Sequence, residues 1–270
     1  MATGRRHYVH GYAERESRRL CDQAATLTGI LHADTAYPAG ASVLEAGCGV
    51  GAQTVILAAN SPGARIVSVD LSGPSLAAAR ALAAAEGIRN VAFVQADIFS
   101  LPFPPASFDH VFVCFVLEHL ADPVSALLRL KTVLRPGGTV TVIEGDHGST
   151  YFHPDSPDAR NAVRCLVEIQ AGMGGDALIG RRLYPLLAEA GFRDVRVSPR
   201  MVYVDATRPA LVEGFTRNTF IAMVEGVREK ALSLGLADAR AWDSGIAGLR
   251  RTTAPDGVFC YTFFKGIGVK

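Results

Sequence analysis

The sequence predicts an α/β fold whose centre is a doubly wound, mostly parallel sheet. Two observations carry this prediction. Short apolar runs alternate with helical segments through the middle of the chain, which is typical of parallel strands joined by crossover helices. The 270 residues, 49% of them hydrophobic and 20% charged, also provide enough apolar side chains for one large core.

The first strand ends in a glycine-rich turn within VLEAGCGVGAQT, residues 43–54. The apolar run meets Glu45, and Gly47, Gly49 and Gly51 then alternate before a helical pattern begins. Glycine is needed where φ is positive or where a ligand lies against the main chain. The N-terminus of the following helix offers free N–H groups. The turn therefore predicts a site for a polar cofactor that carries a nucleoside.

The glycine spacing separates two classes of cofactor. Dinucleotide sites read G-x-G-x-x-G and hold a pyrophosphate at the helix N-terminus. This chain reads G-x-G-x-G after Glu45, whose carboxylate disfavours a pyrophosphate and is compatible with a cationic amino-acid group. A nicotinamide-dependent dehydrogenase is therefore disfavoured.

The second and third strands end in acidic residues. The run Arg65–Val69 leads to Asp70, which is placed to bind the two hydroxyls of a ribose. The run Val91–Gln95 leads to Asp97, which can accept a hydrogen bond from an adenine amino group, with Ile98 against the ring.

Two further strands follow. The fourth covers Phe108–Phe115 and is followed by Leu117-Glu118-His119-Leu120. A helix then begins at Asp122-Pro123, an N-cap and first-turn proline. The helix is expected to end at Pro136-Gly137-Gly138, and the fifth strand to cover Thr139–Glu144.

Together these motifs resemble the class I S-adenosylmethionine-dependent methyltransferases, in particular the small-molecule branch with the ubiquinone/menaquinone C-methyltransferases. The segments that carry the resemblance are VLEAGCGVGAQT, VSVDLS, QADIFSLPFPPASFDHVFVCFVLEHL and LRPGGTVTVIE. The resemblance implies a Rossmann-like sheet of seven strands in the order 3-2-1-4-5-7-6, with the last strand antiparallel, and S-adenosyl-L-methionine as cofactor. The cofactor-binding residues are then expected to be Tyr12, Arg19, Gln23, Glu45, Gly47, Gly49, Gln53, Asp70, Leu71, Ala96, Asp97, Ile98, Phe115 and His119.

The rest of the chain is expected to decorate this core with helical cap inserts. Ligands of open α/β sheets bind outside the carboxyl ends of the strands, where both inserts leave the sheet, so we expect them to roof the site. The predicted division is an N-terminal helical arm over 1–42, the cofactor-binding core over 43–145, a cap insert over 146–176, the core continued over 177–206, a second cap insert over 207–256 and the last core strand over 257–270.

The N-terminal arm has one apolar face at helical spacing, and its other face is polar. Two interpretations stay open. The polar face is either simply solvated, or it brings Tyr12, Arg19 and Gln23 over the glycine-rich turn to hold the methionine carboxylate of the cofactor.

Candidate catalytic groups follow the fifth strand. His147, supported by Glu144 or Asp146, is a plausible general base near neutral pH. His119 is an alternative, although a capping or packing role is equally open. Asp146, His147 and His153 are irregularly spaced in a stretch read as a glycine-rich loop, so no metal site is predicted.

The acceptor is expected to be a small, largely apolar metabolite, because the second insert is rich in apolar side chains. By family resemblance, it is an aromatic compound such as an indole or a quinone, methylated on carbon in secondary metabolism. O- or N-methylation and a noncatalytic S-adenosylmethionine-binding regulator are the alternatives. The side chains expected to contact the acceptor are Tyr8, Tyr151, His153, Tyr203 and Phe220.

Charge and cysteine content narrow the class of substrate and the expected cellular location. The net charge of +1, without a long basic block, argues against a nucleic-acid substrate. No apolar run reaches membrane-spanning length, and residues 1–10 lack a hydrophobic signal core. Five scattered cysteines without a C-x-x-C pair predict reduced thiols and a cytoplasmic location. The oligomeric state stays open, with a homodimer as one alternative.

Overall fold

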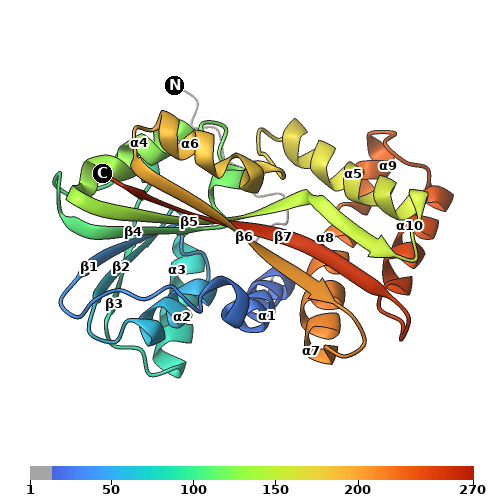
Figure 1. Ribbon diagram of the computed structural model, residues 1–270, viewed down its shortest axis with the longest axis horizontal. Helices are drawn as coiled ribbons and strands as arrows, with labels where there is room; N and C mark the ends of the chain where they lie inside the picture. The colour runs from blue at the N-terminus through green and yellow to red at the C-terminus, as the bar shows by residue number, and fades with distance from the viewer. Residues whose placement is uncertain (1–13) are drawn as a thin grey trace. The chain divides into compact units, whose positions relative to one another are not determined.

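The computed structural model describes residues 14–270, with side chains from residue 19 onward. Its centre is a seven-stranded sheet in the order β3-β2-β1-β4-β5-β7-β6, which confirms the predicted fold class (Figure 1). The strands are β1 Ser42–Ala46, β2 Arg65–Asp70, β3 Val91–Gln95, β4 Phe108–Cys114, β5 Leu134–His153, β6 Arg193–Val204 and β7 Val258–Val269.

The pairing of the strands shows which of them run in parallel. β1 pairs in parallel with β2 and with β4, β2 with β3, and β4 with β5. The amide of Gly137 donates to the carbonyl of Lys270 at 3.3 Å, and the amide of Lys270 donates to the carbonyl of Gly138 at 2.9 Å. These bonds join the start of β5 to the end of the chain after β7, so β7 is the antiparallel strand.

Helices cover both faces of the sheet, with α4 and α6 on one face and α2 and α3 on the other (Figure 1). The α-helices are α1 Glu14–Leu31, α2 Ala52–Asn60, α3 Gly73–Ala85, α4 Pro123–Val133, α5 Pro157–Gly172, α6 Leu183–Glu189, α7 Pro209–Leu211, α8 Ala222–Glu225, α9 Arg228–Ser233 and α10 Ala239–Arg251. Three short 3₁₀ turns are η1 Ile98–Ser100, η2 Leu117–His119 and η3 Ile179–Arg182, and η4 Val212–Ile221 is a π-helix.

Local capping chemistry sets several helix starts. The side chains of Ser72, Asp122, Ser156 and Asp238 each accept a hydrogen bond from the backbone amide three residues later. These are N-caps, and a proline follows in the first turn of α3, α4 and α5.

The fifth strand departs from the prediction. A short strand ending at Glu144 and a glycine-rich loop were expected, but β5 is one strand of 20 residues. The helix before it also ends earlier than expected, at Val133. The reason is that Thr150, Tyr151 and Phe152 favour extended backbone and β7 is long enough to pair with them. The ring of Phe152 stacks parallel to that of Phe259 at 6.5 Å.

The chain forms two compact units. The core unit comprises residues 27–146, 178–202 and 262–270, and the insert unit comprises the described residues 14–26 with 147–177 and 203–261. The boundaries expected for the caps, and their action as a roof, stay predictions. Within residues 14–270, no helix has both the length and the apolar character needed to cross a bilayer.

Each unit has its own packing. In the core unit, sheet residues such as Val111 and Val142 pack with Leu130 of α4 and Leu183 of α6, all with no exposed surface. In the insert unit, α5 and α10 pack closely, because a Cβ atom on Gly245 would lie only 2.6 Å from the carbonyl oxygen of Asp158.

Candidate functional site

The turn after β1 has the left-handed backbone that its glycines predict. The φ angles of Gly47, Gly49 and Gly51 are 77°, 53° and 84°. A Cβ atom on Gly47 would lie 2.5 Å from Cγ2 of Val116, and one on Gly51 would lie 2.9 Å from Cβ of Ala79. A Cβ atom on Gly49 would meet no atom of the described chain within 4 Å. The outer glycines are therefore needed for packing, and the middle one faces space where a ligand can lie.

Asp70 lies directly beside this space, at the carboxyl end of β2. Its Oδ2 accepts a hydrogen bond from the amide of Gly49 at 2.8 Å, and its Oδ1 accepts one from the amide of Ser72 at 2.8 Å. A carboxylate has about four acceptor positions, so both oxygens can accept further bonds. The structure thus brings together the turn and the acid that the sequence singled out.

Glu45 lies deeper than Asp70. It is 2% exposed, and its Oε2 accepts hydrogen bonds from Oγ1 of Thr54 at 2.7 Å and from Oγ of Ser68 at 2.6 Å. Burial raises the pKa of Glu45 to about 7. The side chain therefore ties β1, β2 and α2 together beneath the turn.

The expected adenine-binding residues lie at the ends of β2 and β3. Asp97 accepts a hydrogen bond from the amide of Phe99 at 2.9 Å, which makes it the N-cap of η1. Ile98 is 9% exposed and Leu71 is 54% exposed. The amide of Ala96 donates to the carbonyl of Asp70 at 3.1 Å, which holds the ends of the two strands together.

Phe115 follows β4 in an unusual conformation. Its φ angle is 57°, a left-handed value that costs a bulky side chain about 1–3 kcal/mol. Its amide donates to the carbonyl of Ile143 at 2.9 Å, and its ring lies 5.4 Å from that of Phe263. Such strain persists only where the surroundings enforce it, and here a buried acid does so.

That acid is Glu144 of β5, which has no exposed surface. Its Oε1 accepts hydrogen bonds from the amides of Val116 at 3.0 Å and Leu117 at 2.7 Å. Its Oε2 is buried without a hydrogen-bond partner in the described chain. Burial, and then the nearby Glu118, raise the pKa of Glu144 well above its usual range. Glu144 therefore holds the backbone directly after Phe115.

His119 ends the same short turn. Its Nε2 lies 3.6 Å from Oε1 of Glu118, and both side chains are largely buried. With Glu144, which lies in the middle of β5, Glu118 and His119 are three titratable side chains on or next to the short turn that follows β4. The sequence singled out His119 and Glu144, and it missed Glu118.

The two other expected catalytic residues are engaged separately. Asp146 accepts two hydrogen bonds from Arg181, from Nε at 2.6 Å and from Nη2 at 2.8 Å. His147 is 5% exposed, and its Nδ1 lies 2.7 Å from the hydroxyl of Tyr261. Consecutive residues of a strand project to opposite faces, which is why the two side chains find different partners. Neither Arg181 nor Tyr261 was identified from the sequence as a partner, because each lies far along the chain.

The predicted acceptor-binding residues occupy different environments within the insert unit. Phe220 is 1% exposed, and its ring lies 4.9 Å from that of Phe259 and 5.7 Å from that of Tyr261. Tyr151 and Tyr203 are 55% and 41% exposed, and His153 is also exposed. Tyr8 lies outside the described residues.

The arm residues are only partly described. Nη1 of Arg19 donates to Oε1 of Gln23 at 3.0 Å, and both residues are 9% exposed. Tyr12 lies outside the described residues. The expected role of this group in holding the methionine carboxylate stays a prediction.

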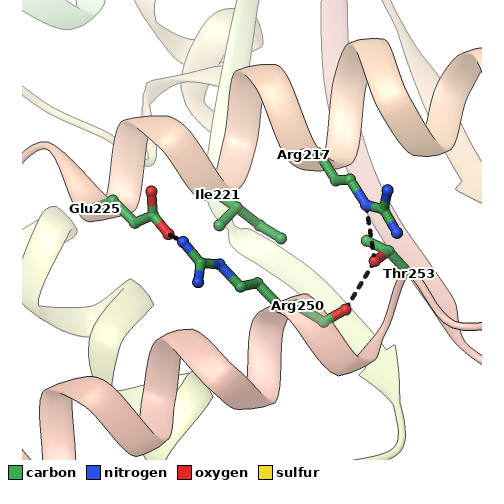
Figure 2. A pocket seen from close by; sticks show the side chains of 5 residues that line it. All are labelled: Arg217, Ile221, Glu225, Arg250 and Thr253. Atoms are coloured by element: carbon green, nitrogen blue, oxygen red, sulfur yellow. Dashed lines mark hydrogen bonds and ion pairs between the residues drawn. The ribbon is translucent and has the colours of Figure 1, made fainter.

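A pocket of about 360 Å³ lies in the insert unit between η4 and the end of α10 (Figure 2). Its lining residues are Arg217, Ile221, Glu225, Arg250 and Thr253. Arg217 Nε donates to Oγ1 of Thr253 at 3.0 Å, and Arg250 pairs with Glu225 at 2.6 Å. Four of its five lining side chains are polar or charged, so the pocket differs from the largely apolar acceptor pocket that the sequence predicts.

The sequence is similar to those of known methyltransferases. Residues 44–142 match a family described as "Methyltransferase domain". Over 225 residues the chain is 32% identical to the 27-O-demethylrifamycin SV methyltransferase of Amycolatopsis mediterranei, covering 83% of this chain and 76% of the relative. The chain belongs to the class I S-adenosylmethionine-dependent methyltransferases. S-adenosylmethionine is the cofactor of this family, as the sequence predicted.

Other methyltransferases match parts of the chain. The demethylmenaquinone methyltransferase of Thermus thermophilus is 40% identical over 102 residues, 38% of this chain and 46% of the relative. A solved structure of phosphoethanolamine N-methyltransferase 2 from Haemonchus contortus, bound to S-adenosylhomocysteine, shares the fold with a TM-score of 0.56. It is 21% identical and covers 92% of this chain and 52% of its own. The chain spans about half the length of several curated relatives that it matches, 55% and 46% of two of them.

The described residues were also compared with the ligand sets that hold metal ions in proteins. Within residues 14–270, no three His, Cys, Asp or Glu side chains gather in a way that could hold a metal ion. The ring of His147 lies 6.1 Å from that of Phe220 and 5.8 Å from that of Tyr261.

Proposed function

We propose that this protein transfers the methyl group of S-adenosylmethionine to a small-molecule acceptor. The observation that carries the proposal is the open space beside Gly49 with the carboxylate of Asp70 at its edge. A bare backbone and an acid at the end of β2 fit a nucleoside with two ribose hydroxyls. When bound, the cofactor supplies an electrophilic methyl group on a positively charged sulfur.

The proposed cofactor contacts follow the strand ends. Asp70 accepts hydrogen bonds from the ribose hydroxyls through its remaining acceptor positions, and Asp97 accepts one from the adenine amino group. Ile98 and the exposed Leu71 cover the adenine ring. Glu45 acts mainly by holding the turn, because its Oε2 is already engaged by two hydroxyl groups.

For the acceptor, we propose a small, largely apolar and aromatic compound that is methylated on carbon. The relative named for demethylmenaquinone supports a quinone-like ring. O-methylation is the second candidate, because the rifamycin relative matches most of the chain and its name specifies an oxygen. Alignment of the acceptor by the protein can supply up to about 7–11 kcal/mol in either reaction.

We further propose that His147 takes the proton that the acceptor loses. In the tautomer whose Nδ1–H donates to the hydroxyl oxygen of Tyr261, Nε2 keeps the lone pair that a base needs. A positioned base contributes about 10²–10⁴-fold to the rate. The support for this proposal is the pairing with Tyr261 inside an aromatic, water-poor surrounding.

Incubation with S-adenosylmethionine labelled in its methyl group, together with indoles, phenols and quinones, tests the proposal. Label in a small-molecule product supports it, and NMR of that product shows whether carbon or oxygen carries the methyl group. Cofactor binding without transfer to any acceptor in the panel favours the noncatalytic regulator. Absence of both binding and transfer overturns the proposal. Asp70→Ala is the matched control, because its weaker cofactor binding should lower transfer at least tenfold at limiting cofactor.

A further inference from the structure

A buried histidine lies beside the first helix of the cofactor site. His32 follows α1 directly and is 1% exposed. Its Nε2 lies 2.7 Å from Oε1 of Gln53, in the first turn of α2. An amide oxygen only accepts, so Nε2 carries the proton and donates it to Gln53. The His32 ring also lies 5.8 Å from that of Phe112 on β4.

The imidazole of His32 is neutral, and its one N–H group donates its hydrogen bond to Gln53. Burial lowers the pKa of His32 to about 4, so the ring carries no charge near neutral pH. Its Nδ1 is buried and has no hydrogen-bond partner in the described part of the chain. The hydrogen bond to Gln53 is therefore the one polar contact of this ring among the described residues.

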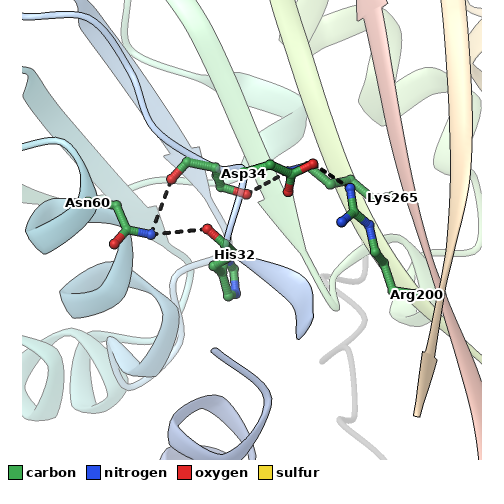
Figure 3. Close-up of polar contacts among 6 residues, drawn as sticks. His32, Asp34, Asn60, Arg200 and Lys265 are labelled. Carbon is green, nitrogen blue, oxygen red and sulfur yellow. Dashed lines mark hydrogen bonds and ion pairs between the residues drawn. The ribbon is translucent and has the colours of Figure 1, made fainter. Parts of the chain in front are cut away.

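The backbone around His32 is fixed from two sides, as Figure 3 shows. Nδ2 of Asn60, at the end of α2, donates to the carbonyls of His32 and Thr35, both at 3.2 Å. On the other side, the carboxylate of Asp34 pairs with Nζ of Lys265 at 2.7 Å and with Arg200 at 2.5 Å. The loop that carries His32 is thus anchored both to α2 and to the sheet.

This anchoring determines which way the Gln53 amide faces. The amide is planar, so once its oxygen is bound to His32, its NH₂ group points away from the ring. Gln53 is half-buried and lies just after Gly51 in the turn. Phe112 is the β4 partner of Glu45, so Gln53 lies on the β4 side of the site, opposite the ribose-binding Asp70 on β2. In the proposed site the adenine lies at the end of β3 and the ribose at the end of β2, so the amino-acid end of the cofactor extends toward β4, and its hydrogen-bond acceptor is a carboxylate.

We propose that His32 is a positioning residue that fixes the Gln53 amide so that its NH₂ group donates to the carboxylate of the bound cofactor. The inference rests on the proposed cofactor site at the glycine-rich turn. It assigns a role to a side chain outside the cofactor motifs, a buried imidazole whose Nδ1 has no hydrogen-bond partner in the described residues.

Calorimetry with two ligands tests this inference. S-adenosylhomocysteine has the amino-acid end, and 5′-methylthioadenosine lacks it. His32→Phe and Gln53→Met should each weaken binding of S-adenosylhomocysteine about tenfold, the effect of losing one hydrogen bond to a charged group. Both variants should bind 5′-methylthioadenosine as the wild type does. The double variant should lose no more than Gln53→Met, because both changes remove the same contact.

Two further variants separate positioning from packing. His32→Gln, whose side-chain amide can donate to Gln53 in place of the imidazole, should retain most of the affinity for S-adenosylhomocysteine. His110→Phe is the matched control, because His110 stacks on Tyr37 at 4.8 Å near the opposite ends of the strands and should affect neither ligand. Thermal unfolding of each variant verifies that it is folded.

Three results would overturn the inference. Equal weakening of both ligands by His32→Phe would mean that His32 only supports packing. Unchanged affinity for S-adenosylhomocysteine in His32→Phe would mean that Gln53 needs no positioning. A wild-type protein that binds neither ligand would contradict the proposed cofactor site itself, which distinguishes that failure from the first two.

Discussion

Glu144 offers a sharp test of how the site is held. Its Oε1 accepts hydrogen bonds from the amides of Val116 and Leu117, which directly follow Phe115 with its left-handed backbone. Glu144→Ala leaves two donors without their acceptor in a buried setting, and each such donor costs about 1–3 kcal/mol. We therefore expect Glu144→Ala to lower the free energy of unfolding by about 2–6 kcal/mol.

Glu144→Gln separates the acceptor from the acid. The amide oxygen of Gln can replace Oε1 as the acceptor, and burial, which raises the pKa of Glu144, disfavours the charged form that Gln lacks. We expect Glu144→Gln to change the free energy of unfolding by no more than about 1 kcal/mol, the net value of one ordinary hydrogen bond. Urea denaturation of the wild type and both variants measures the difference. Equal destabilisation by Gln and Ala would refute the conclusion that Glu144 acts as a hydrogen-bond acceptor for this loop.

Three further predictions follow from the site. Because the pKa of Glu45 is raised, the native state keeps a proton that the unfolded state loses, so the free energy of unfolding should fall between about pH 4.5 and about pH 7. Urea denaturation at several pH values should show a smaller fall for Glu45→Gln. An equal fall in the wild type and the variant would contradict the raised pKa of Glu45. His147→Ala should lower kcat by about 10²–10⁴-fold and leave cofactor affinity nearly unchanged, with the loss shrinking at high pH for a phenol acceptor; full activity at every pH would exclude His147 as the base. Hydrogen exchange in residues 146–176 and 207–256 should slow when cofactor and acceptor are bound, as expected for segments that close over a site; equal exchange with and without ligands would count against a cap.

The turn after β1 and the acid beside it could be predicted from the sequence because their signals are local. Gly47, Gly49 and Gly51 lie within five positions of one another, and their spacing alone requires a tight turn. Asp70 directly ends the next apolar run, and parallel strands bring such ends to one edge. The same logic located Asp97 after β3.

The groups around β5 were harder to predict because their partners are distant in sequence. Tyr261 lies 114 positions from His147, and Arg181 lies 35 positions from Asp146. Nothing local to His147 indicates its pairing. The sequence predicts a loop at Gly145 and Gly148, whereas β5 continues through both residues beside β7, since tertiary context overrides local preference.

The role of Glu144 also depends on contacts that no local pattern shows. Its expected part in catalysis stays a prediction, and its Oε1 accepts hydrogen bonds from amides 27 and 28 positions earlier. The network of Asp34, Lys265 and Arg200 shows the same limit, because it joins the end of the first helix to the last two strands.

Calorimetric titration of S-adenosylhomocysteine into the wild type and Asp70→Ala tests the central claim most directly. The cofactor site assigns to Asp70 two charge-assisted hydrogen bonds to the ribose, each worth about 1.5–3 kcal/mol. The account predicts one binding site per chain in the wild type and at least a tenfold weaker affinity in the variant. A wild type that does not bind, or a variant that binds equally well, would contradict it.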